Sequence, residues 1–270
     1  MHIVKFSIIG LITFTLIITN LVLGFGLLAI LNIPRAFFPS NSLKIYLAKL
    51  SNKLGDITVY GCKKIMYVMH QDSIKVFDDK NFEKNSWYMA MSNHQSWADI
   101  FILLAVANNR LPLLKFFMKK ELIWIPFVFL ANKTLNMPFV NRHSKKDLDK
   151  NPNLRFEDYE NTLKACKRFQ RAPSTIFSYA EGTRNTEEKH LEQKSPYKNL
   201  LKPRIGGMAT ALSAMPNIDT LVDYSLIYKS KKRGAWAFLC GEMKDVKVLV
   251  KSHPTVSYTH LRAHETSIDL

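Results

Sequence analysis

The chain contains 270 residues, of which 47% are hydrophobic and 22% are charged. This composition excludes a mostly disordered polypeptide and allows one well-buried domain with an appendage. Lysine and arginine number 38 against 22 acidic residues, so the net charge of +16 indicates an anionic partner, either nucleic acid or an anionic membrane surface. The three cysteines are far apart and follow no metal-ligand spacing, which suits a reducing compartment and argues against a disulfide framework.

The first expected element is an uncharged apolar run from Phe6 to Pro34. A helix of about 20 apolar residues crosses the hydrocarbon core of a bilayer. The apolar region of a cleaved signal peptide is normally about 7–15 residues, so this run is too long for one. We therefore expect residues 1–35 to form a retained membrane anchor. Gly24 and Gly26 leave two geometries open, a straight span and a re-entrant hairpin.

Basic residues follow the anchor more densely than they precede it. Only Lys5 lies ahead of it among the lysines and arginines, and this bias predicts that the rest of the chain is cytoplasmic. We expect a bacterial inner membrane rather than the endoplasmic reticulum. Anionic membrane lipid is the expected partner, and nucleic acid is not, because no nucleic-acid-binding motif is present. The basic residues that follow the anchor are Arg35, Lys44, Lys49, Lys53, Lys63 and Lys64.

Residues 36–85 are expected to form a linker helix and a first strand, with Ile57–Tyr60 as a strand candidate. The short apolar run Trp87–Met91 predicts a further strand, and Ile100–Val106 predicts the helix that follows it. A polar cluster, residues 92–99, lies at the junction between them. Junctions beyond the carboxyl end of a strand are where α/β proteins place their sites.

The rest of the chain continues in alternating elements. The apolar stretch 111–140 contains charges and is open to two interpretations: a membrane-facing or acyl-chain-lining region, or a buried core helix. Residues 143–171 predict a helix, Thr175–Tyr179 a strand, and 185–204 a charged loop. A stripe of five residues of the predicted helix is expected to be buried: Leu148, Phe156, Tyr159, Leu163 and Cys166.

Three late elements complete the expected fold. An alanine-rich helix follows Gly206 and Gly207 and ends near Ala214, and two strands are expected at Leu221–Tyr228 and Ala235–Leu239. The alternation predicts an α/β fold, a single domain with a central mixed sheet flanked by helices. The expected boundaries of the two segments after the linker are 86–256 for this domain and 257–270 for a tail of uncertain origin.

The spacing of His94 and Asp99 predicts their local geometry. Five residues along an ideal helix rotate the chain by about 500°, which leaves two side chains about 140° apart. The pair can therefore meet only if His94 lies in the turn ahead of the helix and folds back over its first turn. Asp99 would then hold one imidazole nitrogen protonated and leave the other to accept a substrate proton. Such a histidine is a candidate general base.

Three blocks, in this order, resemble the glycerolipid acyltransferase family, which includes the 1-acylglycerol-3-phosphate acyltransferases. They are N-H-x-S-x-x-D at 93–99, F-V-N-R at 139–142 and Y-A-E-G-T-R at 179–184. The segment 198–207 further resembles the branch that contains lysocardiolipin acyltransferase-like enzymes. The segment Leu221–Tyr228 lacks the proline found in the family's fourth block, so the acyl-donor side is left open.

The resemblance implies an O-acyltransferase that moves an acyl group directly from an acyl thioester to the free hydroxyl of a lysophospholipid. The implied co-substrate is acyl-CoA or an acylated carrier protein, with no cofactor and no metal. The first expected acceptor is 1-acyl-sn-glycerol-3-phosphate; a larger lysophospholipid is the alternative. By the resemblance His94 is the catalytic base and Asp99 orients it. Substrate binding is assigned to Asn93, Ser96, Arg142, Glu181, Gly182, Thr183 and Arg184.

The side chains of the arginines, the glycine and the glutamate in the blocks also suit substrate binding on chemical grounds. Arg142 and Arg184 carry planar forks suited to bidentate capture of a phosphate. Gly182 permits close backbone approach at a strand end, and Glu181 is suited either to holding an arginine or to contacting the acceptor's glycerol.

Other chemistries fit the sequence less well. Ser96 beside His94 invites a serine-hydrolase interpretation, but no G-x-S-x-G elbow is present. His260 and His264 lack the H-E-x-x-H order of a zinc site. A catalytically silent lipid-binding protein remains an alternative, against which the intact His94 and Asp99 argue.

Overall fold

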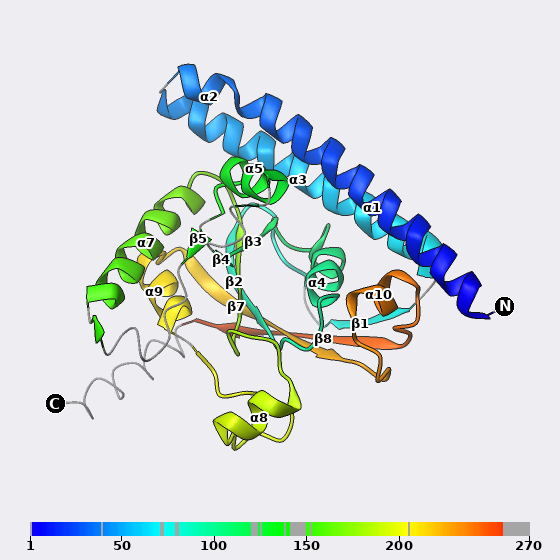
Figure 1. The fold of residues 1–270 in the computed structure, drawn as a ribbon. Coiled ribbons are helices and arrows are strands. Elements are labelled where there is room, and N and C mark those ends of the chain that lie inside the picture. Colours follow the sequence, from blue (N-terminus) through cyan, green and yellow to red (C-terminus); the bar gives the residue numbers. More distant parts are fainter. Residues whose placement is uncertain are drawn as a thin grey trace.

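The computed structural model describes residues 2–38, 40–70, 73–78, 81–119, 124, 126–137, 139–140, 150–151, 153–204 and 206–255. These residues form an α/β fold in which helices cover both faces of a six-stranded sheet, and a long pair of helices crosses one side (Figure 1). The prediction of a mixed sheet flanked by helices is therefore confirmed. Arg142 and the tail 257–270 lie outside the described residues.

The elements alternate along the chain. The strands are β1 (Ile74–Asp78), β2 (Trp87–Ser92), β3 (Leu114–Phe116), β4 (Met118–Lys119), β5 (Phe139–Val140), β6 (Thr175–Tyr179), β7 (Ile218–Ile227) and β8 (Val246–Pro254). The helices are α1 (His2–Asn32), α2 (Pro34–Phe37), α3 (Asn41–His70), α4 (Asp99–Ala107), α5 (Pro126–Thr134), α7 (Asn153–Phe169), α8 (Glu187–Gln193), α9 (Gly206–Ala214) and α10 (Ala235–Leu239).

The sheet has the strand order β1-β8-β7-β2-β6-β3. Strands β7, β2, β6 and β3 are parallel to one another, whereas β8 runs antiparallel to β7 and pairs in parallel with β1. In this register Ser92 at the end of β2 lies between Tyr179 of β6 and Tyr224 of β7. The loops after β2 and β6 therefore begin side by side, at one edge of the sheet.

Two apolar layers enclose the central strands. On one face, Ala90 and Phe177 pack beneath α4 and α10. On the other face, Met89 and Ile176 pack beneath α7 and α9, so β2 and β6 are covered on both sides, as expected for central strands of a parallel sheet (Figure 1). This double cover explains why residues 88–90 form a continuous buried run instead of an alternating pattern.

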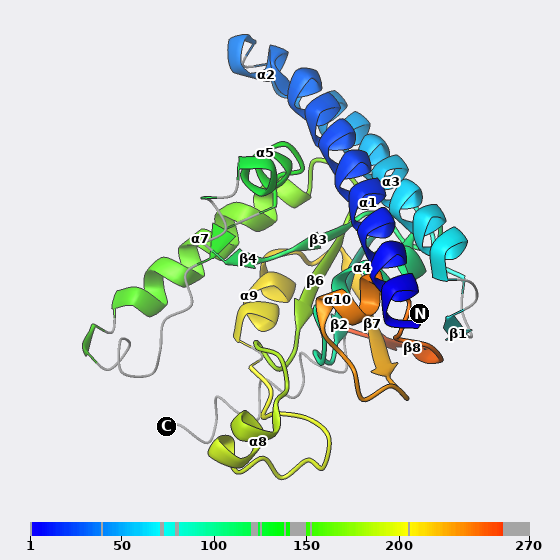
Figure 2. The same cartoon turned by 45° about the vertical axis from the view of Figure 1, so that its right-hand side comes forward.

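Helices α1 and α3 lie side by side over most of their length (Figures 1 and 2). Gly24 makes this possible: a Cβ at that position would overlap the Thr58 side chain on α3. The Asn20 amide donates to the Thr58 carbonyl at 2.8 Å and thus ties the pair together across the same contact. Gly24 and Gly26 lie inside the continuous helix α1, so the anchor segment contains no hairpin within 2–32.

Several element predictions were wrong for identifiable reasons. Ile57–Tyr60 lies inside α3, because packing of Thr58 against α1 overrides the strand preference of β-branched residues. Ala235–Leu239 forms α10, and β8, which pairs with β7 along its length, was not predicted. Phe156 and Tyr159 of α7 are 65% and 45% exposed, while Cys166 is buried as expected.

The described residues of the stretch 111–140 do not form one core helix. That the stretch faces the membrane or lines an acyl chain stays a prediction. Its first part is core: Leu111, Leu114 and Phe116 are buried, and β3 extends the sheet beside β6. Further along, the described residues form β4, α5 and β5. The short β4 and β5 pair with each other in a separate two-stranded sheet.

Candidate active site

His94 and Asp99 meet as the spacing predicts. His94 lies in the turn after β2, and Asp99 is the first residue of α4, so the turn folds the imidazole back over the helix start. Nδ1 of His94 is 2.8 Å from Oδ2 of Asp99. The Asp99 side chain is fully buried, whereas 16% of the His94 side chain is exposed. An ionised carboxylate only accepts, so Nδ1 carries the proton and Nε2 is free to accept one from a substrate.

Asp99 is held by four donors from two parts of the chain. The backbone N–H groups of Gln95 and Ser96 donate to Oδ2 at 2.7 and 3.0 Å, so the carboxylate caps the turn that presents His94. The hydroxyl of Tyr228, just beyond β7, donates to Oδ1. Burial, and then the Asp99 charge, raise the pKa of Tyr228 far above its usual value, so this hydroxyl stays a donor.

Glu181 fastens the loop after β6 to the loop after β2. Its Oε1 accepts the backbone N–H of His94 at 2.9 Å, and its Oε2 accepts the backbone N–H of Leu201 at 2.8 Å. The side chain is only 3% exposed. Asn185 adds a second link, because its N–H donates to the His94 carbonyl at 2.7 Å. Among the described residues Glu181 therefore bonds two backbone amides and forms no ion pair with an arginine.

Asn93 and Ser96 also form hydrogen bonds with backbone groups. The Asn93 amide both donates to the Leu226 carbonyl and accepts the Leu226 N–H, at 2.9 and 2.8 Å, which fastens the turn to β7. The Ser96 hydroxyl, 1% exposed, donates to the Arg233 carbonyl at 2.7 Å and accepts the Ala98 N–H. These side chains hold the turn in shape, and Ser96 is not aligned as a nucleophile with His94.

Tyr179 packs directly on the imidazole. The two rings are stacked with centroids 3.8 Å apart and an interplanar angle of 11°. Phe177 supports Tyr179 from the side with an edge-on contact. Burial, followed by the Asp99 charge, raises the pKa of the Tyr179 hydroxyl well above its usual value. The His94 ring is thus held both by a hydrogen bond and by a stacked neighbour.

Arg184 lies beside the dyad and over an exposed aromatic ring. Its guanidinium carbon is 4.6 Å from the centroid of Trp97, which is 56% exposed. No described carboxylate forms an ion pair with Arg184, so the fork is available to an external anion. Thr183 accepts a hydrogen bond from Nζ of Lys189 at 2.8 Å, which brings a second cation close to the same loop.

Gly182 takes a conformation that requires glycine. Its φ is +68°, and a Cβ there would lie 3.0 Å from Cδ of Arg204. The left-handed turn reverses the chain directly after Glu181, so that Thr183 and Arg184 follow on the same side as His94. The structure thus brings Asn93, His94, Ser96, Asp99, Glu181, Gly182, Thr183 and Arg184 into one cluster. Arg142 is outside the described residues.

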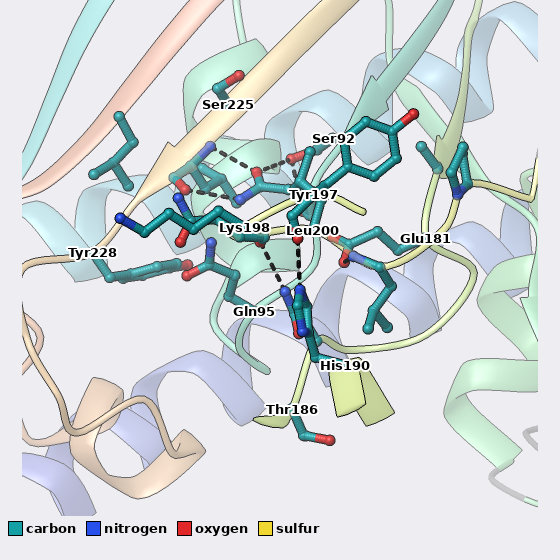
Figure 3. Close-up of a pocket in the computed structure, with 18 of the residues that line it drawn as sticks. Ser92, Gln95, Glu181, Thr186, His190, Tyr197, Lys198, Leu200, Ser225 and Tyr228 are labelled. Carbon is teal, nitrogen blue, oxygen red and sulfur yellow. Dashed lines mark hydrogen bonds between the residues drawn. The ribbon is translucent and has the colours of Figure 1, made fainter. Parts of the chain in front are cut away.

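A large cavity of about 1070 Å³ opens beside this cluster. Tyr228 and Gln95 lie on the side of the cavity opposite Glu181, with His190 between the two walls (Figure 3). Lys198 and Leu200, from the loop after α8, complete the wall. The described lining includes Gln95 and Glu181 but not the His94 ring, so the cavity adjoins the dyad without enclosing it.

The geometry is a histidine oriented by a buried carboxylate, beside a cavity and an arginine that no described carboxylate pairs with. The model of the family described as "Acyltransferase" matches residues 73–214, more than half of the chain. The chain belongs to the acyltransferase family. It is therefore an enzyme of the O-acyltransferase kind. No curated protein matches the sequence.

A solved structure supports the fold of this acyltransferase. The crystal structure of the 1-acyl-sn-glycerophosphate (LPA) acyltransferase PlsC from Thermotoga maritima matches with a TM-score of 0.55 and 18% sequence identity. The match covers 94% of this chain and 86% of that one, so the helical pair and the sheet are both included. At this identity the likeness shows the fold alone.

Two residues of the acyltransferase site were missed by sequence reasoning. Tyr228 reaches Asp99 across the sheet, and Arg233 donates to the Gln95 side chain at 2.6 Å. Tyr228 is the last residue of the segment Leu221–Tyr228, for which only a strand and a missing proline were predicted, and Arg233 lies beyond it. Among the described residues no group of three or more His, Cys, Asp or Glu side chains is placed to hold a metal ion.

Proposed function

We propose that this acyltransferase transfers a fatty acyl group from an acyl thioester to the free hydroxyl of 1-acyl-sn-glycerol-3-phosphate, which gives phosphatidic acid. The observation that carries the proposal is the buried Asp99 holding His94 at 2.8 Å, with Arg184 unpaired beside it among the described residues. A hydroxyl acceptor needs a base, and an acceptor phosphate needs an accessible cation.

The chemistry follows from the tautomer. Nε2 of His94 takes the proton of the acceptor hydroxyl as its oxygen attacks the thioester carbonyl. The tetrahedral intermediate then collapses, the carbon–sulfur bond breaks, and the departing thiolate takes the proton from the imidazolium. The products are an ester and a thiol, so protons balance and no covalent enzyme intermediate forms. Asp99 stabilises the imidazolium between the two steps, and no cofactor or metal is required.

Arg184 has the chemistry to hold the acceptor's phosphate. Its planar fork can bind two phosphate oxygens at once, and stacking on Trp97 fixes the plane of the fork. Lys189, bonded to Thr183, adds charge to the same loop. Arg142 has the same chemistry as a second phosphate ligand, by its sequence block alone. Acyl-CoA and an acylated carrier protein are both possible donors.

A larger lysophospholipid is the second candidate acceptor. The cavity of about 1070 Å³ beside the dyad provides room for a headgroup bulkier than a phosphate. Lys198, Leu200 and Leu201 line it, and they belong to the segment that resembles lysocardiolipin acyltransferase-like enzymes. Parallel assays with lysophosphatidic acid, lysophosphatidylglycerol and lysocardiolipin discriminate between the two acceptor classes.

Replacement of the base tests the function itself. His94→Ala in the purified full-length chain should lower acyl transfer about 10²–10⁴-fold, because no other described group is placed as the base. Phosphatidic acid formed from acyl-CoA and 1-acyl-sn-glycerol-3-phosphate is measured by mass spectrometry. His253→Ala on β8, outside the site, is the matched control and should keep wild-type activity. Transfer by His94→Ala within threefold of wild type would reject the mechanism.

We also propose that α1 anchors the enzyme in the membrane with the catalytic domain on the cytoplasmic side. Residues 7–32 have the length and composition to cross a bilayer, and only 17% of the most apolar part of this stretch is buried in the protein. Leu11, Leu23 and Ile30 are each more than 60% exposed along α1. The basic residues after the anchor support the cytoplasmic placement. The bacterial inner membrane is the proposed location.

A further inference from the structure

A second cavity lies at the opposite edge of the sheet from the dyad. Its volume is about 850 Å³, and it opens between α3, the start of β2 and the end of α7. Trp87, the first residue of β2, and Pro173, just before β6, form part of its wall. The dyad lies beyond the other ends of these strands. A strand of six residues separates the two edges by roughly 20 Å, so this cavity is distinct from the active site.

Five cations converge on this second cavity, from three parts of the chain. Two come from α3, one from the loop before β2 and two from the end of α7: Lys49, Lys53, Lys84, Lys167 and Arg171. Asp56 is the one acid among its described lining residues. None of the five cations forms an ion pair with another described residue.

The arrangement brings like charges together at mostly exposed positions. Lys49 and Lys53 are four residues apart on one helix face, a spacing at which like charges repel. The basic end of α7 has an ordinary explanation, since cations complement the helix dipole there. That explanation does not cover Lys49, Lys53 and Lys84, which face the same cavity from α3 and from a loop. An anion bound between them would remove the repulsion.

Asp56 does not neutralise the cluster fully. Burial raises the pKa of its carboxyl to about 6, although the charges of Lys84 and Lys115 oppose the shift. Near neutral pH the carboxylate therefore balances only one of the five lining cations. The remaining positive charge is four, which matches a ligand with at least one phosphate group.

The cavity is built on fixed supports. The Asn52 amide donates to the Pro173 carbonyl at 2.8 Å and to the Ser174 hydroxyl at 3.3 Å, which fixes α3 against the start of β6. The Trp87 indole N–H donates to the Phe169 carbonyl at 3.0 Å and fixes β2 against α7. The cations are therefore presented around a rigid floor.

The surroundings of the cavity indicate the type of anion. Ile45, which is 43% exposed, lines the cavity, and its neighbour Tyr46 is 63% exposed. Phe37 and Phe38, before α3, are also exposed. The same helix α3 packs along the apolar helix α1 (Figure 2). Cations that line the cavity, together with exposed apolar side chains on and just before α3, suit an amphiphile whose phosphate meets the cations and whose acyl chains stay outside.

We propose that this cavity binds the phosphate headgroup of an anionic membrane phospholipid, at a site separate from the catalytic dyad. The bound lipid orients the domain on the membrane beside α1. Lipid binding at this cavity does not depend on which acceptor or donor the enzyme uses. It should be saturable and headgroup-selective, and it should survive loss of the active-site arginine.

Calorimetric titration of the full-length protein in neutral detergent tests the site. The probe is dihexanoylphosphatidylglycerol, and the comparison ligands are dihexanoylphosphatidylcholine and inorganic phosphate. Wild type should bind the anionic lipid at least tenfold more tightly than either comparison ligand. Lys49→Gln with Lys53→Gln should weaken this binding roughly 30-fold, since each cation near an anionic headgroup contributes about a fivefold factor. Lys49→Glu with Lys53→Glu should weaken it further.

Two control variants and one comparison ligand make the result decisive. Lys75→Glu with Lys244→Glu changes the net charge equally at exposed positions elsewhere, and should leave binding within threefold. Arg184→Ala should also leave it within threefold, whereas loss of binding in that variant would place the lipid at the active site and overturn the proposal.

Equal weakening of lipid binding by both Lys→Glu pairs would overturn the proposal, because it would show unspecific charge attraction. Inorganic phosphate binding as tightly as the lipid would overturn the lipid assignment in favour of a free anion. If the Lys→Glu pair fails to fold, the Lys→Gln pair decides.

Discussion

The Tyr228 hydroxyl donates a hydrogen bond to Oδ1 of Asp99, 129 positions earlier in the chain. This bond joins the end of β7 to the first turn of α4, and both side chains are buried. Oδ2 of the same carboxylate is shared by His94 and two backbone amides. The orientation of the proposed base therefore depends on a strand that contributes no residue to the three sequence blocks.

Tyr228→Phe should reduce kcat/KM about tenfold, because a buried carboxylate loses one of its donors. The measurement is kcat/KM with the acceptor varied at saturating donor. Tyr88→Phe is the matched control, since its buried hydroxyl bonds a backbone N–H at the far end of β2. An unchanged kcat/KM in Tyr228→Phe would exclude a positioning role.

Arg184→Ala should raise the KM for the acceptor roughly 10–150-fold, because a charge-assisted contact to phosphate contributes about 1.5–3 kcal/mol. Trp97→Ala should have a smaller effect in the same direction, since it removes the ring that fixes the guanidinium. Steady-state kinetics with acceptor and donor varied separately gives the two KM values. Arg168→Ala, an exposed arginine on α7, serves as the control. An effect confined to the donor's KM would show that Arg184 does not hold the acceptor's phosphate.

The candidate site was predictable because it is local in sequence. The pair His94 and Asp99 lies within one turn and one helix start, so helix geometry allows the two side chains to meet only in the observed fold-back. The order of β2, α4 and β6 was also predictable, because each element contains an apolar run in the sequence with polar residues on either side. Local spacing therefore predicted how the two side chains meet, whereas their roles as base and orienting partner are what the family resemblance implies.

The parts that could not be predicted depend on contacts between distant segments. The roles of Asn93 and Glu181 are decided by backbone groups of Leu226 and Leu201, which no local pattern reveals. The helix at Ala235–Leu239 packs against α1, and this tertiary contact is invisible in five apolar residues that suit a strand equally well. Strand β8 was missed because Lys247 and Lys251 interrupt its apolar residues, although they fit the alternation of a half-buried strand.

The apolar helix α1 should make membrane association resistant to salt. Burial of about 20 apolar residues in lipid is not screened by ions, whereas attraction between surface charges falls off within about 8–10 Å at physiological salt. Washing membranes from expressing cells with concentrated salt should therefore leave the full-length protein in the membrane fraction, and detergent should release it. Release by salt alone would remove the main support for the anchor and for the cytoplasmic placement.

The contact between Gly24 and Thr58 should control how α1 docks on the domain. In Gly24→Ala the added methyl group overlaps the Thr58 side chain, and overpacking of this kind costs about 1–3 kcal/mol. Gly26 is the matched control on the same helix, because a Cβ there meets nothing within 4 Å.

The two alanine variants should therefore differ in the thermal midpoint of the detergent-solubilised protein. Gly26→Ala should keep or slightly raise it, since alanine is favoured over glycine within helices by up to about 1 kcal/mol. Gly24→Ala gains the same helix preference but loses more to the overlap, so its midpoint should fall by roughly 2–6 °C. Circular dichroism at 222 nm follows both transitions. Equal midpoints in the two variants would show that α1 does not pack closely on α3 at Gly24.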